Sequence, residues 1–446
     1  MVFPHLNHHI LSYYLKAHFS WEIVVEHMLE NRLLLQILLL LLIDIYIYTS
    51  VYRTTRSFTP VFRNLVRWGI WALTALAISA VVWYNVTDPY YKAMSIRQWI
   101  ITTVVVIYAS KLLTILVIFV DDIQINTRRF IRFLQTRSGE RIPGKPITRS
   151  EFFDKAAIAV GLVPFAPMVT GILSGAHDYR VFRKTIYLPN LPRSFDGIRI
   201  GQISDIHAGT FFNKTAVKGG VEMFMKEKAD VILFTGDLVN YQTNEIEDYI
   251  SVFDKVRAPL GVFSSTGNHD YGNYRKWTDA AAKRKNFQDL LTAHRLLGYD
   301  LLMNEHRILE SGGDQIAIIG VENWGMGPSL RFPKYGKLAE ASKGTEDMLV
   351  RILLSHDPSH WDAQIRPDFP GIDLTFAGHT HGFQMGIEIG DFRWSPSQYI
   401  YKQWAGLYRE DNQYLYVNRG YGCIGYPGRI GMPPELTVIE LKRGES

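Results

Sequence analysis

Four apolar stretches in the first 176 residues constrain this chain more than any other feature of its sequence. They cover residues 33–51, 68–87, 99–120 and 156–176. Asp44 and Lys111 are the only charged residues within them. About 20 apolar residues cross the hydrocarbon core of a bilayer, so we expect four transmembrane helices. The fourth stretch contains Pro164, Pro167 and three glycines, which membrane helices tolerate.

The charge of the chain separates this membrane part from the rest. We expect an N-terminal tail over 1–32, a transmembrane region over 33–176 and a globular domain over 177–446. Residues 1–176 hold 17 Lys and Arg against 10 Asp and Glu, whereas the remainder holds 31 against 33. The globular part therefore lacks the basic excess of a nucleic-acid-binding protein, and we expect no nucleic-acid partner. The single cysteine excludes a disulfide scaffold and a Cys-based metal site.

Basic residues in the loops predict the orientation in the membrane. Loops 52–67 and 121–155 together hold 12 Lys and Arg, whereas loop 88–98 and the N-terminal tail hold four. Loops rich in Lys and Arg stay in the cytoplasm. The globular domain then lies outside the cytoplasm if the fourth stretch crosses the membrane, and inside it if that stretch does not cross.

Asp44 and Lys111 are predicted to lie at about the same depth in the first and third helices. Charges inside a membrane are costly and generally find a partner, so an ion pair between the two helices is one interpretation. In the alternative, Lys111 extends to the interface and Asp44 faces a wet crevice.

Short apolar segments alternate with amphipathic helical segments after residue 177. Helices are predicted over 215–228, 243–256, 274–297, 335–349 and 358–365. The strands that matter most for function are predicted over 198–204, 230–235, 260–265, 350–355 and 372–377. Alternation of strands and helices, followed by a strand-rich end, predicts a layered α/β domain.

Each of these five strands runs directly into residues that can bind a metal. The residues are Asp205 and His207, Asp237, Asn268 with His269 and Asp270, His356, and finally His379 and His381. Ligands of α/β sheets gather beyond the carboxyl ends of the strands. We therefore expect these side chains to converge on one site.

The ligand types favour two divalent cations. Carboxylates, imidazoles and one amide form a mixed oxygen and nitrogen set, which suits Mn, Fe, Co or Zn. The ligands are too many for one ion, and Asp237 is the natural bridge. Two metals a few ångströms apart can hold a bridging hydroxide and clamp a phosphoryl group.

The order of these motifs resembles that of the calcineurin-like metallophosphoesterase superfamily. The pattern D-x-H, G-D, G-N-H-[DE], a lone His and G-H-x-H stands here as DIH, GD, GNHD, His356 and GHTH. The resemblance covers about residues 195–441 and implies a four-layer α/β/β/α sandwich behind the N-terminal all-α transmembrane helices. His294, His306 and His360 lie in the same interval, but only His356 ends an apolar strand.

The same resemblance implies a role for each site residue. Asp205, His207 and His381 would hold the first metal, Asn268, His356 and His379 the second, and Asp237 would bridge them. His269 would lie beside the phosphate and protonate the leaving oxygen, with Asp270 orienting its ring.

A closer resemblance is to the bacterial membrane-anchored or exported phosphodiesterases. It rests on the segments RIGQISDIHAGTF, GHTHGFQ and YVNRGYGCIGYPGRIGMPPELTVIEL. It implies an integral protein of the bacterial plasma membrane that hydrolyses phosphoester or pyrophosphate bonds, with a lipid-linked or cell-envelope substrate. The alternatives are a cytoplasm-facing hydrolase of the UDP-2,3-diacylglucosamine pyrophosphatase type and a catalytically silent membrane sensor or scaffold.

Two further groups of residues bear on the substrate, each with two interpretations. Arg419 and Arg429 either grip a substrate phosphate or form structural ion pairs. The aromatic residues near the end of the chain either line a lipid-facing surface or pack in the core. They are Trp394, Tyr399, Tyr401, Trp404 and Tyr408.

Overall fold

The computed structural model describes residues 32–52, 55–86, 94–136, 160–161, 163, 165–327, 332–390 and 392–445. It divides into two compact units, Met1–Ala166 and Pro167–Ser446. Residues 1–31 of the expected tail and most of the basic loop 121–155 lie outside the described residues. We describe each unit by itself.

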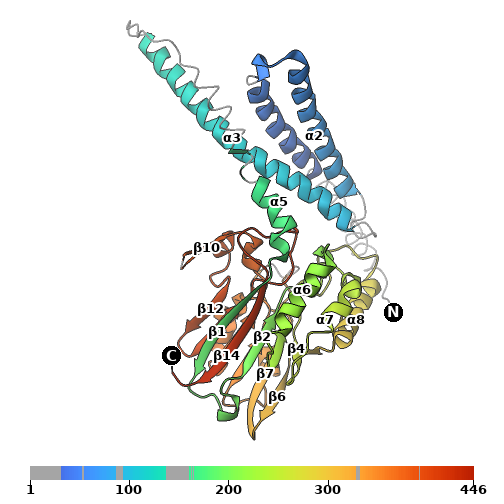
Figure 1. The fold of residues 1–446 in the computed structure, drawn as a ribbon, viewed down its shortest axis with the longest axis vertical. Coiled ribbons are helices and arrows are strands. Elements are labelled where there is room, and N and C mark those ends of the chain that lie inside the picture. Colours follow the sequence, from blue (N-terminus) through green and yellow to red (C-terminus); the bar gives the residue numbers. More distant parts are fainter. Residues whose placement is uncertain are drawn as a thin grey trace, which may run out of the picture. The chain divides into compact units, whose positions relative to one another are not determined.

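The first unit contains three helices that are long and apolar enough to cross a membrane. They are Arg32–Tyr52, Pro60–Asn85 within α2 (Pro60–Val86), and Trp99–Ile131 within α3 (Met94–Thr136) (Figure 1). They contain the first and third expected spans, 33–51 and 99–120, and the second from residue 68 to residue 86. The fourth expected span is described only in part, and its longest described helix is α5 (Phe165–Leu173). Its crossing of the membrane stays a prediction.

The expected ion pair between Asp44 and Lys111 is confirmed. Lys111 Nζ lies 2.6 Å from Asp44 Oδ1, and the Asp44 side chain is fully buried. Thr74 Oγ1 and Tyr108 Oη each donate a hydrogen bond of 2.6 Å to Asp44 Oδ2. The carboxylate is therefore paired and hydrogen-bonded at a point where three helices meet, and the wet-crevice alternative is wrong.

Breaking this pair on one side is expected to cost more than removing both charges. Lys111→Met leaves a buried, unpaired carboxylate, which destabilises by about 3–5 kcal/mol, whereas neutralising both partners costs little. The double variant Asp44→Asn/Lys111→Met should therefore recover most of the thermal stability that Lys111→Met loses. Thermal unfolding in detergent, followed by tryptophan fluorescence, measures this. Equal losses in the single and double variants would contradict an energetically coupled pair.

Two six-stranded sheets form the second unit. The first has the order β1-β14-β2-β3-β4-β5 and the second β12-β13-β9-β8-β7-β6. The strands of the first sheet are β1 (Arg180–Leu188), β2 (Arg199–Ile203), β3 (Val231–Phe234), β4 (Val262–Ser264), β5 (Asp300–Leu301) and β14 (Glu435–Arg443). Those of the second are β6 (Glu305–Ser311), β7 (Asp314–Gly320), β8 (Arg351–Leu354), β9 (Leu374–Ala377), β12 (Gly406–Glu410) and β13 (Gln413–Val417).

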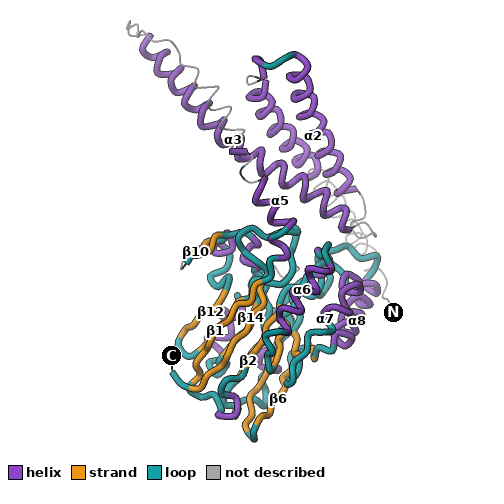
Figure 2. Tube along the Cα trace, viewed as in Figure 1, coloured by secondary structure: helices purple, strands orange, loops and turns teal. Residues whose placement is uncertain are grey.

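Three hydrophobic cores make this unit a sandwich of four layers. One core lies between the sheets and includes Leu233 and Phe376. A second lies under the helices that cover the first sheet, and a third packs Trp361 against the outside of the second sheet. The expected α/β/β/α arrangement is therefore confirmed (Figure 2).

Helices of very different lengths cover the two sheets. The first sheet is covered by α6 (Lys214–Met225), the 3-10 helix Thr243–Tyr249, α7 (Ile250–Phe253) and α8 (Ala280–Leu297). The second sheet is covered by α9 (Leu338–Ala341), the π-helix Trp361–Ile365 and α10 (Arg366–Asp368). The expected helix over 335–349 is wrong, because only α9 forms there and Gly344 then adopts a left-handed φ of 89°.

Parallel pairing brings the functional loops to one edge. β2, β3 and β4 are parallel neighbours in the first sheet, and β7, β8 and β9 are parallel neighbours in the second. Their buried apolar runs, such as VILF in β3, are typical of strands covered on both faces. The carboxyl ends of these strands therefore deliver the following loops to the same side of the sandwich.

Candidate dimetal centre

Two clusters of metal-binding side chains lie at this edge. The first joins Asp205, His207 and His381, and the second joins Asp237, His356 and His379. In each cluster one ligand atom from every residue lies within 4.8 Å of the others. The first cluster has the three residues expected from the sequence. The second has His356 and His379 of the expected set, together with the expected bridge Asp237.

Asp237 faces both clusters. Its Oδ2 atom lies 3.1 Å from Nε2 of His356 and 3.5 Å from Nε2 of His207. One carboxylate oxygen thus approaches an imidazole of each cluster, which is the position that a bridging ligand requires.

Several buried polar atoms at this site lack the partners that such atoms normally have. Asn268 Oδ1, His207 Nε2 and His381 Nε2 accept or donate no hydrogen bond within the described part of the chain. Asn268 Nδ2 donates to Tyr274 Oη at 2.5 Å, so its carbonyl oxygen is the atom left free. Buried polar atoms are otherwise almost always satisfied, and cations fit these oxygen and nitrogen atoms.

The backbone at the ligands is strained. Five of them adopt φ between 46° and 72°: Asp205, His207, Asp237, His379 and His381. This left-handed region costs a non-glycine residue about 1–3 kcal/mol, and such costs concentrate at functional sites. Gly267 permits the close packing, because a Cβ there would lie 2.2 Å from Asp237 Oδ1.

Neighbouring groups fix the imidazoles of the second cluster. His356 Nδ1 donates to the carbonyl of Thr235 at 2.7 Å. His379 Nε2 lies 2.8 Å from Tyr401 Oη and 3.7 Å from Asp357 Oδ2. The remaining nitrogens of the two rings, Nε2 of His356 and Nδ1 of His379, lie 3.2 Å apart. Partners of this kind orient metal-binding imidazoles.

Tyr401 and Asp357 were not expected at the site. Asp357 directly follows His356, so an acid beside a ligand was the available signal. Tyr401 carried no such signal, because it reaches His379 from a loop 22 residues further along the chain.

Burial and charge set the protonation of the histidines. Burial lowers the pKa of His207 and of His269, which opposes a positive charge on either ring. Burial opposes protonation of His356 too, but the Asp237 carboxylate outweighs it and raises the pKa of His356 to about 10. A cation that binds His356 Nε2 must therefore displace a proton.

His269 lies beside both clusters without belonging to either. Its Nδ1 donates to the carbonyl of Asn240 at 2.7 Å, which leaves Nε2 free. The ring stacks on Tyr274 at 4.0 Å and lies 4.9 Å from the ring of His207, centroid to centroid. The structure therefore holds an oriented imidazole next to the metal-binding residues.

The expectation that Asp270 orients this ring is wrong. The Asp270 carboxylate accepts hydrogen bonds from the backbone N–H groups of Gly267, Asp237 and Leu238, at 2.8–3.0 Å. Burial, with the nearby Asp237 charge, raises the pKa of Asp270 to about 7. Asp270 joins the loops after β3 and β4, whereas the Asn240 carbonyl orients His269.

Asp270→Ala is therefore expected to destabilise the fold. It would leave three N–H groups without their acceptor, and each unsatisfied buried donor costs about 1–3 kcal/mol. We expect the unfolding temperature to fall by roughly 6 °C or more, with Asp270→Asn intermediate because its amide oxygen still accepts. Circular dichroism during heating measures this. An unchanged unfolding temperature together with lost activity would instead assign Asp270 a role in the chemistry.

The two arginines of the C-terminal region are structural. Arg419 pairs with Glu435 at 2.7 Å and with Glu388 at 3.1 Å. Arg429 is buried and donates to the backbone carbonyls of Gly420 and Met432, among others. Both guanidinium groups are occupied by the protein, so the phosphate-gripping interpretation is not supported.

The remaining expected side chains divide between core and surface. Trp404 is buried in a small core with Met432, and Tyr401 touches His379. Tyr399 is 76% exposed. His294, His306 and His360 bind Ser264, the Ala341 carbonyl and Ser355 respectively, away from both clusters. His356 is thus the histidine that the site uses.

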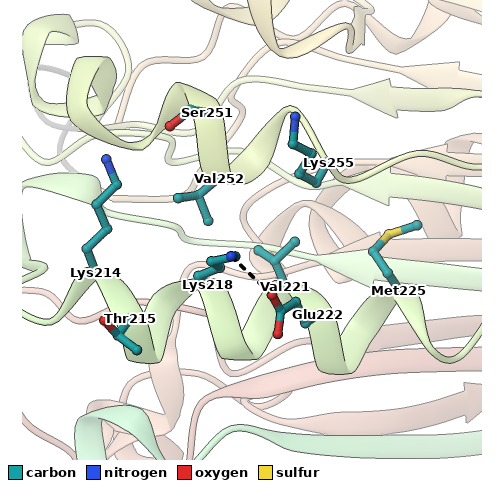
Figure 3. A pocket seen from close by; sticks show the side chains of 9 residues that line it. All are labelled: Lys214, Thr215, Lys218, Val221, Glu222, Met225, Ser251, Val252 and Lys255. Atoms are coloured by element: carbon teal, nitrogen blue, oxygen red, sulfur yellow. Dashed lines mark ion pairs between the residues drawn. The ribbon is translucent and has the colours of Figure 1, made fainter.

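Two clefts of the globular unit differ in their distance from the metal-binding residues along the fold. One of about 470 Å³ is lined by Asp357 and Tyr401, the two residues that touch His379, and by Ile400 and Lys402. The other, of about 700 Å³, lies between α6 and α7 (Figure 3). Its lining contains none of the metal-binding residues, and Lys218 there pairs with Glu222 at 3.5 Å. The lining of the first cleft contains none of the metal-binding residues either, but Asp357 and Tyr401 place it next to His379.

Comparison with known proteins agrees with this geometry. Residues 198–383 match the family model described as "Calcineurin-like phosphoesterase". The uncharacterized metallophosphoesterase YkuE of Bacillus subtilis is 31% identical over 274 residues, which cover 60% of this chain and 86% of YkuE. The chain belongs to the calcineurin-like metallophosphoesterase family. It is accordingly a metal-dependent phosphoester hydrolase, and the members of this family bind divalent metals.

The membrane part also matches a family model, and two further relatives are similar to the chain. Residues 31–176 match a model described as "Probable Calcineurin-like phosphoesterase, transmembrane domain". "Transmembrane protein with metallophosphoesterase domain" of Danio rerio is 30% identical over 281 residues, which cover 62% of this chain and 60% of that protein. UDP-2,3-diacylglucosamine pyrophosphatase LpxG of Chlamydia trachomatis is 27% identical over 326 residues, which cover 61% of this chain and 93% of LpxG. This metallophosphoesterase is therefore an integral membrane protein.

Proposed function

We propose that this protein uses two divalent metal ions to hydrolyse phosphoester or pyrophosphate bonds of lipid-linked or cell-envelope substrates. The observation that carries the proposal is the position of Asp237 Oδ2 between His207 and His356, one from each cluster. A carboxylate shared in this way serves a pair of ions rather than one.

The proposed ligands follow from the two clusters. Asp205, His207 and His381 hold one ion, and Asn268, His356 and His379 hold the other, with Asp237 shared. Asn268 joins the second set because its buried Oδ1 has no other partner among the described residues. When bound, two such cations supply a hydroxide nucleophile and neutralise phosphoryl charge.

His269 is the proposed catalytic acid. The bond from its Nδ1 to the Asn240 carbonyl fixes the tautomer and aims Nε2 at the space beside the clusters. As the imidazolium, which carries a proton on each nitrogen, it donates the Nε2 proton to the leaving oxygen and returns to the neutral Nδ1–H form. An oriented imidazole that binds no metal serves catalysis better than a silent sensor or scaffold, because metal binding alone does not need it.

The catalytic unit is proposed to lie outside the cytoplasm, in the periplasm or its equivalent. Two observations support this side. The basic loops 52–67 and 121–155 favour a cytoplasmic location, and the matched transmembrane model extends to residue 176, the end of the fourth apolar stretch.

A second candidate is a cytoplasm-facing hydrolase of the UDP-2,3-diacylglucosamine pyrophosphatase type. The match to LpxG, which spans 93% of that protein, favours it. This candidate differs from the first in the side of the membrane and in a nucleotide-sugar lipid as substrate.

One pair of experiments separates the two candidates. A C-terminal alkaline phosphatase fusion is active only outside the cytoplasm, and a C-terminal green fluorescent protein fusion fluoresces only inside it. The purified full chain is then tested with Mn²⁺ on lipid phosphoesters and on UDP-diacylglucosamine. A fluorescent, phosphatase-inactive fusion together with cleavage of the UDP lipid would replace the first candidate with the second.

A further inference from the structure

The hairpin formed by β10 (Ile387–Ile389) and β11 (Phe392–Trp394) has one apolar face. Ile387 lies opposite Trp394, and Ile389 lies opposite Phe392. Side chains of directly paired residues point to the same side of a hairpin. Ile387, Ile389 and Phe392 are 46%, 73% and 61% exposed. A face of this kind needs an apolar partner, because a two-stranded hairpin alone is barely stable in water.

The opposite face of the hairpin is polar and holds it to the globular unit. Glu388 lies opposite Arg393. Glu388 pairs with the buried Arg419, and Arg393 donates to the carbonyl of Ala405 at 3.2 Å. The apolar face is therefore turned away from these anchoring contacts.

The base of the hairpin is joined to α5, which belongs to the fourth expected span. Ile430 exchanges backbone hydrogen bonds with Gln384 and Gly386 at 2.8–2.9 Å, and the N–H of the preceding Arg429 donates to the carbonyl of Gly171 in α5 at 3.0 Å. The packing is close, since a Cβ on Gly171 would lie 2.9 Å from the Arg429 carbonyl. Figure 1 shows β10 beyond the ends of the two large sheets, on the side of the globular unit where α5 lies.

These contacts set the level of the hairpin relative to a bilayer. Gly171 lies five residues before residue 176, where the matched transmembrane model ends, and α5 ends at Leu173. The polar interfacial layer of a bilayer is about 5–8 Å thick on each side. With the fourth apolar stretch crossing the membrane as expected, the base of the hairpin lies beside the end of that crossing, where this layer begins.

We infer that the apolar face of the β10–β11 hairpin docks into the interfacial layer of the bilayer that holds the transmembrane helices. Tyr399 extends this surface, because Trp394 Nε1 donates to Tyr399 Oη at 3.3 Å. Tryptophan and tyrosine are the residues that favour this layer.

Docking places the cleft beside His379 near the level of the lipid headgroups. Ile400, which is 67% exposed, follows Tyr399 and lines the cleft beside Tyr401 and His379. A phosphoester in a lipid headgroup can then enter this cleft from the membrane side. This consequence rests on the proposed function, whereas the docking itself does not.

Fluorescence on the full chain tests the docking. Cys423 is the single cysteine and is buried, so Ile389→Cys offers one site for an environment-sensitive nitrobenzoxadiazole probe. The matched control is Leu349→Cys, which is 60% exposed and precedes β8 at the opposite edge of the sheet. Both proteins are placed in vesicles of phosphatidylethanolamine and phosphatidylglycerol that carry nitroxide lipids.

We expect the probe at residue 389 to emit at shorter wavelength and to be quenched by headgroup-level nitroxides at least about twofold more than the probe at residue 349. Equal quenching at the two positions would overturn the inference. A blue shift at residue 389 without lipid quenching would overturn it too, since protein, either this chain's own helices or a second copy, would then cover the face.

A pair of phosphodiesters tests the consequence for catalysis. Hexadecyl p-nitrophenyl phosphate in the vesicles and ethyl p-nitrophenyl phosphate in solution release the same product. We expect Ile389→Ser/Phe392→Ser to lower the hydrolysis of the hexadecyl ester at least about fivefold while changing that of the ethyl ester less than about twofold. Equal effects on both esters would contradict the positioning role. Hydrolysis of neither ester by the wild-type protein would instead count against the proposed function and leave the fluorescence result standing.

Discussion

Asp237→Asn should lower phosphoesterase activity by at least about 10³-fold, equivalent to about 4 kcal/mol of transition-state stabilisation. Asp237 Oδ2 lies between imidazoles of both clusters. Its replacement by an amide removes the negative charge that would hold two cations close together. Initial rates with Mn²⁺ on p-nitrophenyl phosphate and bis-p-nitrophenyl phosphate measure the loss.

The metal content of the same samples tests whether the loss of activity is due to a loss of bound metal. We expect elemental analysis to show about two ions per wild-type chain and at most about one in Asp237→Asn. Asp289→Asn is the matched control, because this exposed carboxylate pairs only with Lys285 among the described residues, and it should keep both its metal and its activity. Full activity in Asp237→Asn would refute the assignment of the whole centre.

His269→Ala should lower the rate by about 10²–10⁴-fold, the range typical of a lost general acid. Unlike Asp237→Asn, it should keep its metal content, since His269 belongs to neither cluster. The loss should be larger for phenyl phosphate than for p-nitrophenyl phosphate, because p-nitrophenolate leaves without needing a proton. A ratio of rates on these two esters measures this difference.

His306→Ala is the matched control for this change. His306 Nδ1 donates to the carbonyl of Ala341 at 2.9 Å, much as His269 Nδ1 donates to that of Asn240. It lies on β6 and should leave both rates within about twofold of wild type. Equal losses on both esters in His269→Ala would show that His269 binds the phosphate without protonating the leaving group.

The ligand set was readable from the sequence because each ligand directly follows an apolar strand. Asp205 lies two residues beyond β2, and His356 lies two residues beyond β8. Parallel strands that are buried on both faces bring such residues to one edge with little dependence on other detail. For Asp44 and Lys111 the sequence indicated only an equal depth in the bilayer, and the structure decided for the ion pair over the wet crevice.

The groups that orient the side chains of the site could not be predicted from the sequence. The group that fixes His269 is the backbone carbonyl of Asn240, and a carbonyl has no signature in the side-chain sequence. Asp270 stands next to His269 but points to the amides of Asp237 and Leu238, over 30 residues away. Strand β1 was not expected either, since most of its residues are not fully buried.

The sequence by itself determined that this chain enters a membrane and carries two sets of metal ligands. Both conclusions depend on local properties, namely the length of apolar stretches and the residues that end each strand. Only the tertiary structure decided that Asp270 joins two loops, that Tyr401 supports His379, and that the β10–β11 hairpin leaves an apolar face exposed. The physical reason is that each of these depends on which distant backbone or side-chain atoms come within bonding distance after folding.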